Sequence, residues 1–278
     1  MYELKKFAAT GKDLHFDRPL SNLSVAFRPK NFIVDQIAPI VNVNKRSDLF
    51  RIWSKEDGLR VPETYRAPKT PIKRGYTEVS SEQYFAKNYA WGTDNSLEDL
   101  DNVDNDIDLV QNSIEFVTTG LWLGWEDRVS TKLTTAANVG SSVTLSGTDQ
   151  WTDQTISDPI GDIFTGINAV FSTTGFEANK MVIGRKAFQD LQRHPAIIEA
   201  VFGDRGSNTL ATAQAIATWF GLEKIIVAKK IKNTADEGAA GIITGSYEEI
   251  WGNDVLIYHA PDRPALLTPS FMYSFRWT

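Results

Sequence analysis

The longest hydrophobic pattern in the chain recurs at helical spacing between residues 104 and 136. Its apolar positions, three or four residues apart, are Ile107, Val110, Ile114, Val117, Leu121, Trp125, Val129 and Leu133. This spacing places them on one face of an α-helix. Acidic residues crowd its beginning, where carboxylates favour the positive end of the helix dipole; they are Asp99, Asp101, Asp104, Asp106 and Asp108. We predict one long helix whose apolar face, centred on Leu121 and Trp125, packs on the sheet of the body.

Two stretches rich in β-branched and aromatic residues come before this helix. The first contains Phe50, Ile52 and Trp53, and the second contains Tyr76, Val79, Tyr84, Phe85, Tyr89 and Trp91. Pro68 and Pro71 lie between them and favour a turn. The pattern predicts two long strands around a proline-rich tip. Because a two-stranded ribbon is marginally stable alone, we expect residues 47–90 to lie on another subunit.

Helical and strand patterns alternate after residue 155. Helices are expected near 159–171, 185–192 and 208–220, and strands at 180–184, 224–228, 240–244, 254–259 and 271–277. The small, polar residues 137–155 indicate a loop or short hairpin. Strands interleaved with helices predict an α/β or α+β body with a mixed sheet.

The first 45 residues are interpreted as an extended arm with short apolar patches, among them Phe32, Ile33, Val34, Ile37, Ala38, Ile40 and Val41. Charge divides the chain at the end of the predicted ribbon tip. Residues 1–75 hold 15 Lys and Arg against 8 Asp and Glu, whereas residues 76–278 hold 14 against 27. A basic extension on an acidic body is expected to reach onto an oppositely charged copy of the same chain. The candidate interface cations are Arg46, Arg51, Lys55, Arg60, Arg66, Lys69, Lys73 and Arg74.

The composition narrows the function classes. The 278 residues are 42% hydrophobic, with a net charge of −6, a pI near 5.2 and no cysteine. The absence of cysteine excludes disulfides, thiolate nucleophiles and cysteine-based zinc sites. The acidic balance argues against a dedicated nucleic-acid binder. No signal pattern or membrane-spanning apolar run appears, so we expect a soluble protein, without a membrane partner, that folds in a cytoplasm.

Candidate catalytic and metal-binding patterns all have a plainer explanation. Asp104, Asp106, Asp108 and Glu115 match four positions of a calcium loop, but the required glycine is replaced by Leu109, so helix capping is preferred. His15, His194 and His259 lack metal-site spacing, and His194 before Pro195 indicates a helix end. Gly203, Arg205 and Gly206 suggest a phosphate loop, but so short an element is more typical of a surface loop, which is preferred. No nucleophile elbow or phosphate-binding motif occurs, and we expect no catalytic, cofactor or metal site.

The order of arm, ribbon, acid-capped helix, alternating body and terminal strand resembles the major capsid proteins of tailed bacteriophages, with the Hong Kong 97-type fold. Three stretches carry the resemblance: FRPKNFIVDQIAPIVNVNKRSDLFRIWSKEDGLR, DPIGDIFTGINAVFSTTGFEANKMVIGRKAFQDLQRHPAIIEAVFG and WFGLEKIIVAKKIKN. The second carries Pro159, Gly175, Asn179, Gly184, His194 and Pro195.

This resemblance implies an α+β capsid fold with an N-terminal arm (1–45), an extended loop (46–90), a peripheral domain with a spine helix (91–140), an axial domain (141–262) and a return strand of the peripheral domain (263–278). It implies pentamers and hexamers of an icosahedral shell, in the virion, assembled in the host bacterial cytoplasm and weakly contacting packaged double-stranded DNA. Scaffolding is expected to be a separate protein, beside a portal and a decoration protein. No covalent cross-link is carried over from the family.

Two other functions remain open from the residues. An encapsulin-like compartment shell shares the fold and would enclose proteins, whereas an α/β small-molecule enzyme would need a cleft with convergent polar groups.

Overall fold

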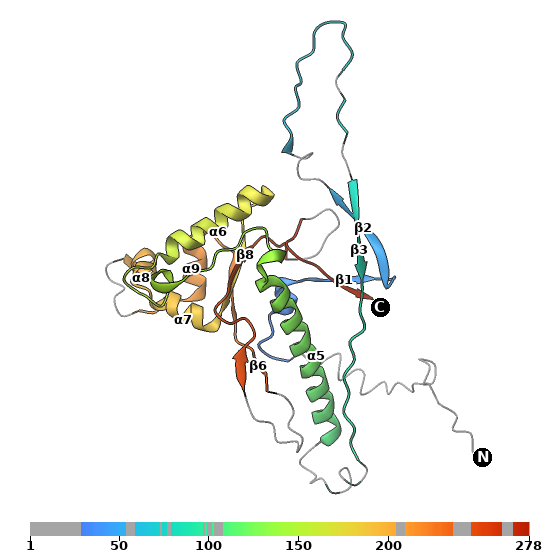
Figure 1. Cartoon of the computed structure of the whole chain (residues 1–278), viewed down its shortest axis with the longest axis vertical. Helices are drawn as coiled ribbons and strands as arrows, with labels where there is room; N and C mark the ends of the chain where they lie inside the picture. The colour runs from blue at the N-terminus through green and yellow to red at the C-terminus, as the bar shows by residue number, and fades with distance from the viewer. Residues whose placement is uncertain are drawn as a thin grey trace, which may run out of the picture.

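The computed structural model describes residues 29–53, 59–72, 74–76, 79–96, 98, 102, 108–203, 209–235, 246–262 and 269–277 (Figure 1). Its helices are α2 (Val34–Ile37), α5 (Leu109–Thr134), α6 (Pro159–Thr174), α7 (Arg185–Arg193), α8 (Pro195–Phe202) and α9 (Ala213–Phe220), with two 3₁₀ turns at Ala136–Asn138 and Gly147–Asp149. Its strands are β1 (Ile40–Val43), β2 (Ser47–Trp53), β3 (Val79–Phe85), β4 (Lys180–Gly184), β5 (Lys224–Ala228), β6 (Ile231–Asn233), β7 (Tyr247–Glu249), β8 (Val255–Tyr258) and β9 (Ser274–Trp277).

A three-stranded mixed sheet forms the centre of the body. Its strand order is β5-β4-β8, with β4 parallel to β5 and antiparallel to β8. Every residue of β4 is buried. Because side chains alternate between the faces of a strand, Met181 and Ile183 enter one hydrophobic cluster and Val182 enters the other. The predicted mixed sheet is confirmed, and the bounds predicted for β4 and β5 agree with the structure.

Helices α6 to α9 cover one face of this sheet (Figure 1). Helix α8 was missed, because Pro195 was interpreted only as the end of α7. Proline is also well suited to the first turn of a helix, where its missing N–H needs no partner. Helix α9 begins at Ala213 rather than residue 208, since the side chain of Thr212 accepts a hydrogen bond from the backbone N–H of Ala215 and caps the helix there.

Helix α5 and the segment around α2 cover the other face. Phe32 and the residues of α2 were expected in an extended arm, but Phe32, Ile33, Val34, Ile37 and Ala38 are all buried. Ile33, Val34 and Ile37 share a hydrophobic cluster with Val129 and Leu133 of α5 and with Tyr258 of β8. The interpretation of residues 32–38 as part of an extended arm was therefore wrong. A four-residue helix is too short to show a helical period in sequence.

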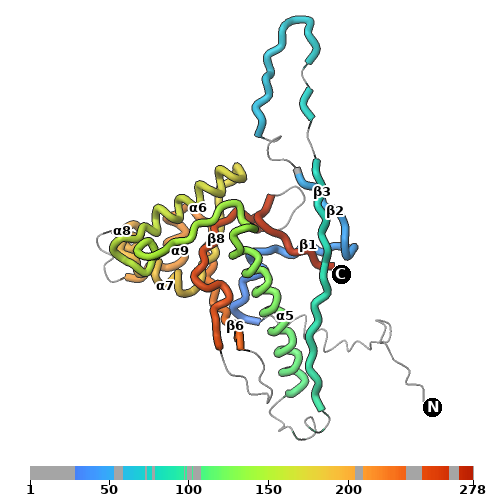
Figure 2. Tube along the Cα trace, in the orientation of Figure 1, coloured from blue at the N-terminus to red at the C-terminus, as the bar shows by residue number. Residues whose placement is uncertain are grey.

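Helix α5 is shorter than predicted and packs over only part of its length. It begins at Leu109, where the side chain of Asp108 accepts a hydrogen bond from the N–H of Gln111 at 2.9 Å. Its buried residues are Thr118, Glu126, Val129, Ser130 and Leu133. Leu121 was predicted to pack on the sheet, but it is 36% exposed, so this prediction was wrong. Trp125 was predicted to pack there too, and it is partly buried against the hydrophobic cluster that includes Val129 and Leu133. Figures 1 and 2 show why Leu121 is exposed: the N-terminal half of α5 runs beyond the sheet.

A buried carboxylate ties α5 to two distant segments. Glu126 has no exposed surface. Its Oε2 accepts a hydrogen bond from the backbone N–H of Ile33 at 2.9 Å, and its Oε1 accepts one from the indole N–H of Trp251 at 3.2 Å. One turn later, the Ser130 hydroxyl donates to the Ile250 carbonyl at 2.8 Å. Burial raises the pKa of Glu126 above its ordinary value, while these donors act in the opposite direction.

Three two-stranded sheets surround the body. β1 pairs with β9 in parallel, whereas β2 with β3 and β6 with β7 pair antiparallel. The predicted last strand is confirmed as the shorter β9, and the strand predicted at 254–259 is β8. Residues 137–155 contain only the two 3₁₀ turns. The strand predicted at 240–244 lies outside the described residues.

Replacing Glu126 should test this junction. Glu126→Ala leaves two buried donors without an acceptor, which should lower the free energy of unfolding by about 1–3 kcal/mol for each donor. Glu126→Gln keeps one acceptor oxygen and should lose less. The matched control is Glu115→Ala on the same helix, where the carboxylate accepts from the exposed side chain of Gln111; it should change stability by less than about 0.5 kcal/mol. Equal losses for Glu126→Ala and Glu115→Ala, measured by urea unfolding, would contradict the junction.

The same variants give a pH dependence of defined sign. Because the folded state raises the pKa of Glu126 above 4.5, it binds the proton more tightly than the unfolded chain does. The wild type should therefore lose stability relative to Glu126→Gln as pH rises from about 4.5 through the folded-state pKa. Urea unfolding of both proteins across this range measures the difference, and a difference independent of pH would show that Glu126 does not titrate as inferred.

Candidate assembly surfaces

The β2–β3 ribbon projects from the body as a long loop (Figure 1). The strands pair from Ser47 opposite Phe85 to Trp53 opposite Val79. Beyond them, residues 59–72 and 74–76 are all exposed, and the backbone turns where Thr70 N–H donates to the Ala67 carbonyl at 3.3 Å. The predicted ribbon and the turn at Pro68 are confirmed, but each strand is only seven residues long.

Large apolar side chains are exposed along the projecting loop. They include Val61 at 91% and Tyr65 at 80% exposure, with Leu59, Ile72 and Tyr76 also exposed. Exposed apolar residues grouped in this way are typical of an interaction surface. The ribbon tip, defined here as residues 59–76, is therefore the first candidate assembly surface.

The base of the ribbon is anchored, in contrast to its tip. The ring of Phe275 on β9 stacks on Tyr84 at 4.7 Å between centroids and contacts Phe50 at 5.6 Å. The hydroxyl of Tyr84 donates to the carbonyl of Lys45 at 3.1 Å. These contacts hold both strands against the β1–β9 sheet and set the direction in which the tip projects.

The predicted interface cations divide into two groups. The Arg46 guanidinium lies 4.9 Å from the centre of the Phe85 ring, and its Nε donates to the Ala86 carbonyl at 3.3 Å, so Arg46 braces the ribbon base. Arg51, Arg60, Arg66, Lys69 and Arg74 are exposed and form no ion pair with another described residue. Lys55 and Lys73 lie outside the described residues. The structure thus brings Arg60, Arg66, Lys69 and Arg74 to the tip, and their carboxylate partners stay a prediction.

The segment after β3 runs along α5 instead of extending the ribbon (Figure 2). Tyr89 and Trp91 were expected in the returning strand, but Arg128 lies over the Tyr89 ring at 3.7 Å and the Trp91 ring meets Phe116 at 4.7 Å. A Cβ atom on Gly120 would collide with the Trp91 ring, so this glycine is the notch that admits the indole. Tyr89 and Trp91 were assigned to a strand because aromatic residues are common both in strands and on surfaces that pack against a helix.

The buried His194 was missed as a packing residue. The predicted helix end at His194 is confirmed, because His194 is the residue that ends α7 and precedes α8. Its side chain is also buried. Its Nε2 lies 3.1 Å from the Ser157 hydroxyl, which itself donates to the Asp153 carbonyl at 2.6 Å. The Ser157 oxygen therefore accepts from an Nε2–H of His194. Burial lowers the pKa of His194 and favours the neutral ring.

Within the ranges that the structure describes, no cluster of three or more His, Cys, Asp or Glu side chains is arranged to hold a metal ion. No helix in the same ranges is long and apolar enough to cross a membrane. The aspartates at 99, 101, 104 and 106, together with Arg205, Gly206 and His15, fall outside the described residues. Asp108 is the helix cap that was preferred over a calcium ligand.

Similarity to known proteins agrees with this structural picture. No family model matches the chain. The major capsid protein of Pseudomonas phage JBD67 is 28% identical over 227 residues, which cover 80% of this chain and 71% of that protein. The major capsid protein of a Burkholderia phage, BcepMu, is 23% identical over 274 residues, covering 94% and 83%. A solved phage-related protein from Bordetella bronchiseptica RB50 has a TM-score of 0.68 at 24% identity, covering 94% of this chain and 83% of that one.

The solved structure supports an α+β capsid fold for this chain. Its similarity to two phage major capsid proteins indicates a structural protein and not an enzyme.

Two glycines of α5 provide a test of the Trp91 notch. Gly120→Ala should lower the free energy of unfolding by about 1–3 kcal/mol, because the new methyl group displaces the indole. Gly124→Ala is the matched control, since its Cβ would meet only the end of the flexible Arg128 side chain at 3.1 Å. It should be neutral or stabilising by about 0.5–1 kcal/mol. Thermal unfolding compares the two, and equal behaviour would mean that Trp91 does not occupy the notch.

Proposed function

We propose that this chain is the shell-forming subunit of a phage capsid with the Hong Kong 97-type arrangement, assembling as pentamers and hexamers of an icosahedral shell around packaged DNA. The observation that carries the proposal is the ribbon. Its base is fixed to the body by Phe275, whereas its tip exposes the large side chains of Val61 and Tyr65. The names of the two relatives and the solved phage-related fold support the same function.

The elements correspond to the parts of such a subunit as follows. Residues 46–90 form the extended loop, 91–140 the peripheral domain with α5 as its spine helix, 141–262 the axial domain and 263–278 the return strand. In the proposed arm, 1–45, the segment from Phe32 to Ala38 belongs to the core of the body. The arm that reaches a neighbour would therefore end before Phe32.

A neighbouring copy is the partner that a ribbon of this kind requires. A two-stranded ribbon is marginal without a third element, and exposed apolar side chains gain free energy when they are covered. When one surface of a subunit meets a different surface of the next, the contact is heterologous, and it builds closed rings if the rotation closes. Pentamers and hexamers are such rings.

The proposal also includes components other than this chain. Scaffolding, portal and decoration would be supplied by separate proteins, and assembly would take place in the host bacterial cytoplasm. The net charge of −6 suits a container that contacts double-stranded DNA weakly, because strong attachment would hinder filling and release.

Deleting residues 63–73 should leave a folded subunit that cannot close shells. The deletion removes most of the exposed tip and none of the described body. Electron microscopy of the purified protein should show closed shells for the wild type and unassembled subunits for the variant, with the same thermal unfolding as wild-type subunits. A deletion of 141–144, in the exposed loop after α5, is the control and should assemble. Normal shells from the 63–73 deletion would contradict an assembly role for the ribbon.

Assembly should also weaken as salt concentration rises. Each exposed ion pair contributes about 0–1 kcal/mol to the free energy of association, and salt screens it. Because the same pairs recur at every contact between subunits, their small contributions add up over the shell. Light scattering of assembling protein across a NaCl series should show a decreasing yield. A charge-neutral variant, with Gln at Arg60, Arg66, Lys69 and Arg74, should lose this salt dependence. A wild-type yield unaffected by salt would mean that these cations are not opposite carboxylates.

A further inference from the structure

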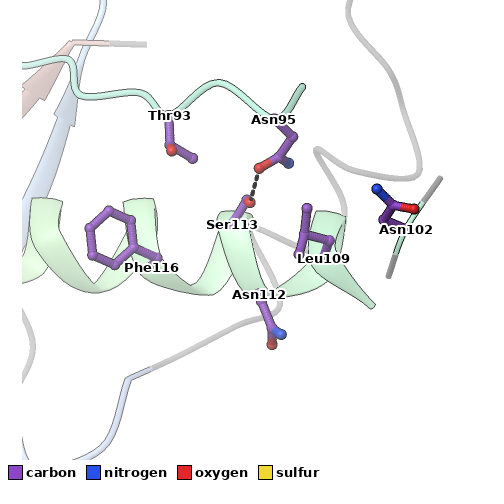
Figure 3. A pocket seen from close by; sticks show the side chains of 7 residues that line it. All are labelled: Thr93, Asn95, Asn102, Leu109, Asn112, Ser113 and Phe116. Atoms are coloured by element: carbon purple, nitrogen blue, oxygen red, sulfur yellow. Dashed lines mark hydrogen bonds between the residues drawn. The ribbon is translucent and has the colours of Figure 1, made fainter. Parts of the chain in front are cut away.

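His194 is a titratable residue that solvent hardly reaches. It is 2% exposed, in the corner where α7 ends and α8 begins. The hollow beside Phe116, about 510 Å³ in volume, shows the opposite setting (Figure 3). There the Ser113 hydroxyl is hydrogen bonded to the Asn95 side chain at 3.0 Å in an exposed position, so water can replace either partner. A charge that appears on His194 must instead be met by groups of the protein.

One of the two ring nitrogens of His194 lacks a partner among the described residues. Nε2 lies 3.1 Å from the Ser157 hydroxyl, whose own hydrogen goes to the Asp153 carbonyl at 2.6 Å. In the neutral ring Nε2 therefore carries the hydrogen, and Nδ1 is a buried lone pair with no hydrogen bond to any described residue. Protonation adds a second N–H at Nδ1, which would be a buried donor without an acceptor.

The two carboxylates whose charge acts on this ring are already engaged. Oδ1 of Asp153 accepts from the N–H groups of Thr155 and Ile156 at 2.9 and 3.2 Å. Oδ1 of Asp158 accepts from the Gly161 N–H at 2.9 Å and caps α6. Neither carboxylate can turn to Nδ1 without giving up its turn or its cap.

The helices around the corner carry few other charges near the ring. They are Asp190 and Arg193 at the end of α7, Glu199 on α8 and Asp162 on α6, whereas α9 has none. Asp162 already accepts a hydrogen bond from a tryptophan indole. Within the described part of the chain, none of these side chains is hydrogen bonded to Nδ1.

The pKa of His194 fixes the sign of the response to acid. Burial lowers this pKa below its ordinary value of 6.5, while the Asp153 backbone and the carboxylates of Asp158 and Asp153 act in the opposite direction. The closed corner therefore binds the proton less tightly than an opened one. Its stability is complete above pH 6.5 and is lost as pH falls through the folded-state pKa.

Two other buried groups respond to acid with the opposite sign. Burial raises the pKa values of Glu126 and Asp254, so their protonation favours the folded state. A loss of structure on acidification therefore cannot come from either of them.

We propose that His194 is an acid-sensitive latch, whose protonation releases the Ser157 hydroxyl and opens the corner formed by residues 153–158 and 191–198. The opening reaches α8 because the His194 carbonyl accepts from the N–H groups of Ile197 and Ile198 at 3.0 and 3.1 Å, in the first turn of that helix. The corner lies at the end of the body far from the ribbon (Figure 1). The latch is complete within one subunit, so it does not depend on the shell function.

Hydrogen exchange of the full-length subunit tests the latch. Between about pH 7.5 and about pH 5, and after correction for the intrinsic pH dependence of exchange, amides of 153–158 and 194–198 should lose protection. The loss should reach about tenfold for each pH unit by which the pKa is lowered. Amides of the central strand β4 are the internal control and should stay protected. Equal protection of the corner at both pH values would overturn the latch.

A neutral substitute separates His194 from other titrating groups. His194→Gln keeps a side-chain N–H for the Ser157 oxygen but cannot take up a proton, so its corner should stay protected at the lower pH. His259→Gln is the matched control, because it removes a histidine bonded to the Glu177 carbonyl at 2.7 Å, and it should open as the wild type does. A loss of protection in His194→Gln equal to that of the wild type would refute the proposal.

The wild type also provides a readout that needs no variant. NMR titration of the folded subunit should give the His194 imidazole a pKa below 6.5. A value at or above 6.5 would overturn the latch, and this measurement decides the question if His194→Gln does not fold. Failure of the protein to form shells would overturn the shell function and leave the latch standing.

Discussion

The two hydrogen bonds to the buried carboxylate of Glu126 hold together the parts of the molecule on which everything else depends. They join the spine helix to the backbone before α2 through Ile33, and to the turn before β8 through Trp251. A carboxylate without solvent contact would be costly if either donor were missing. The junction therefore sets the position of α5 over the sheet, and the position of α5 in turn sets where its free N-terminal half points.

The ribbon and the N-terminal half of α5 both extend beyond the body. Phe275 and Tyr84 fix the ribbon at its base, and Trp91, seated in the Gly120 notch, fixes the following segment along α5. The molecule presents exposed cations such as Arg66 at the ribbon tip and the exposed carboxylates Asp94 and Asp108 near the beginning of α5. This separation of charge suits association between unlike surfaces, and it discourages the two ends of one chain from satisfying each other.

Sequence reasoning succeeded where one local signal was strong. β4 and β5 were predicted at their observed bounds, since a short apolar run between polar residues is typical of a buried strand. It failed where local signals conflicted. Pro195 both ends α7 and begins α8, and Tyr89 and Trp91 suit a strand as well as a helix surface. The ribbon and its cations were identified from composition, whereas the contact of Trp91 with Gly120 was not, because its two sides come from separate segments.

The sequence by itself determined the strands β4 and β5, the mixed sheet, the projecting ribbon and the difference in charge between the first 75 residues and the rest, because periodicity, proline positions and charge are local properties of the chain. Only the tertiary structure decided which apolar residues are buried. Ile33 and Val34 became core and Leu121 remained exposed, since burial depends on the segment that packs opposite each residue. The same reason applies to Glu126, whose acceptor role requires donors 93 and 125 residues away in the chain.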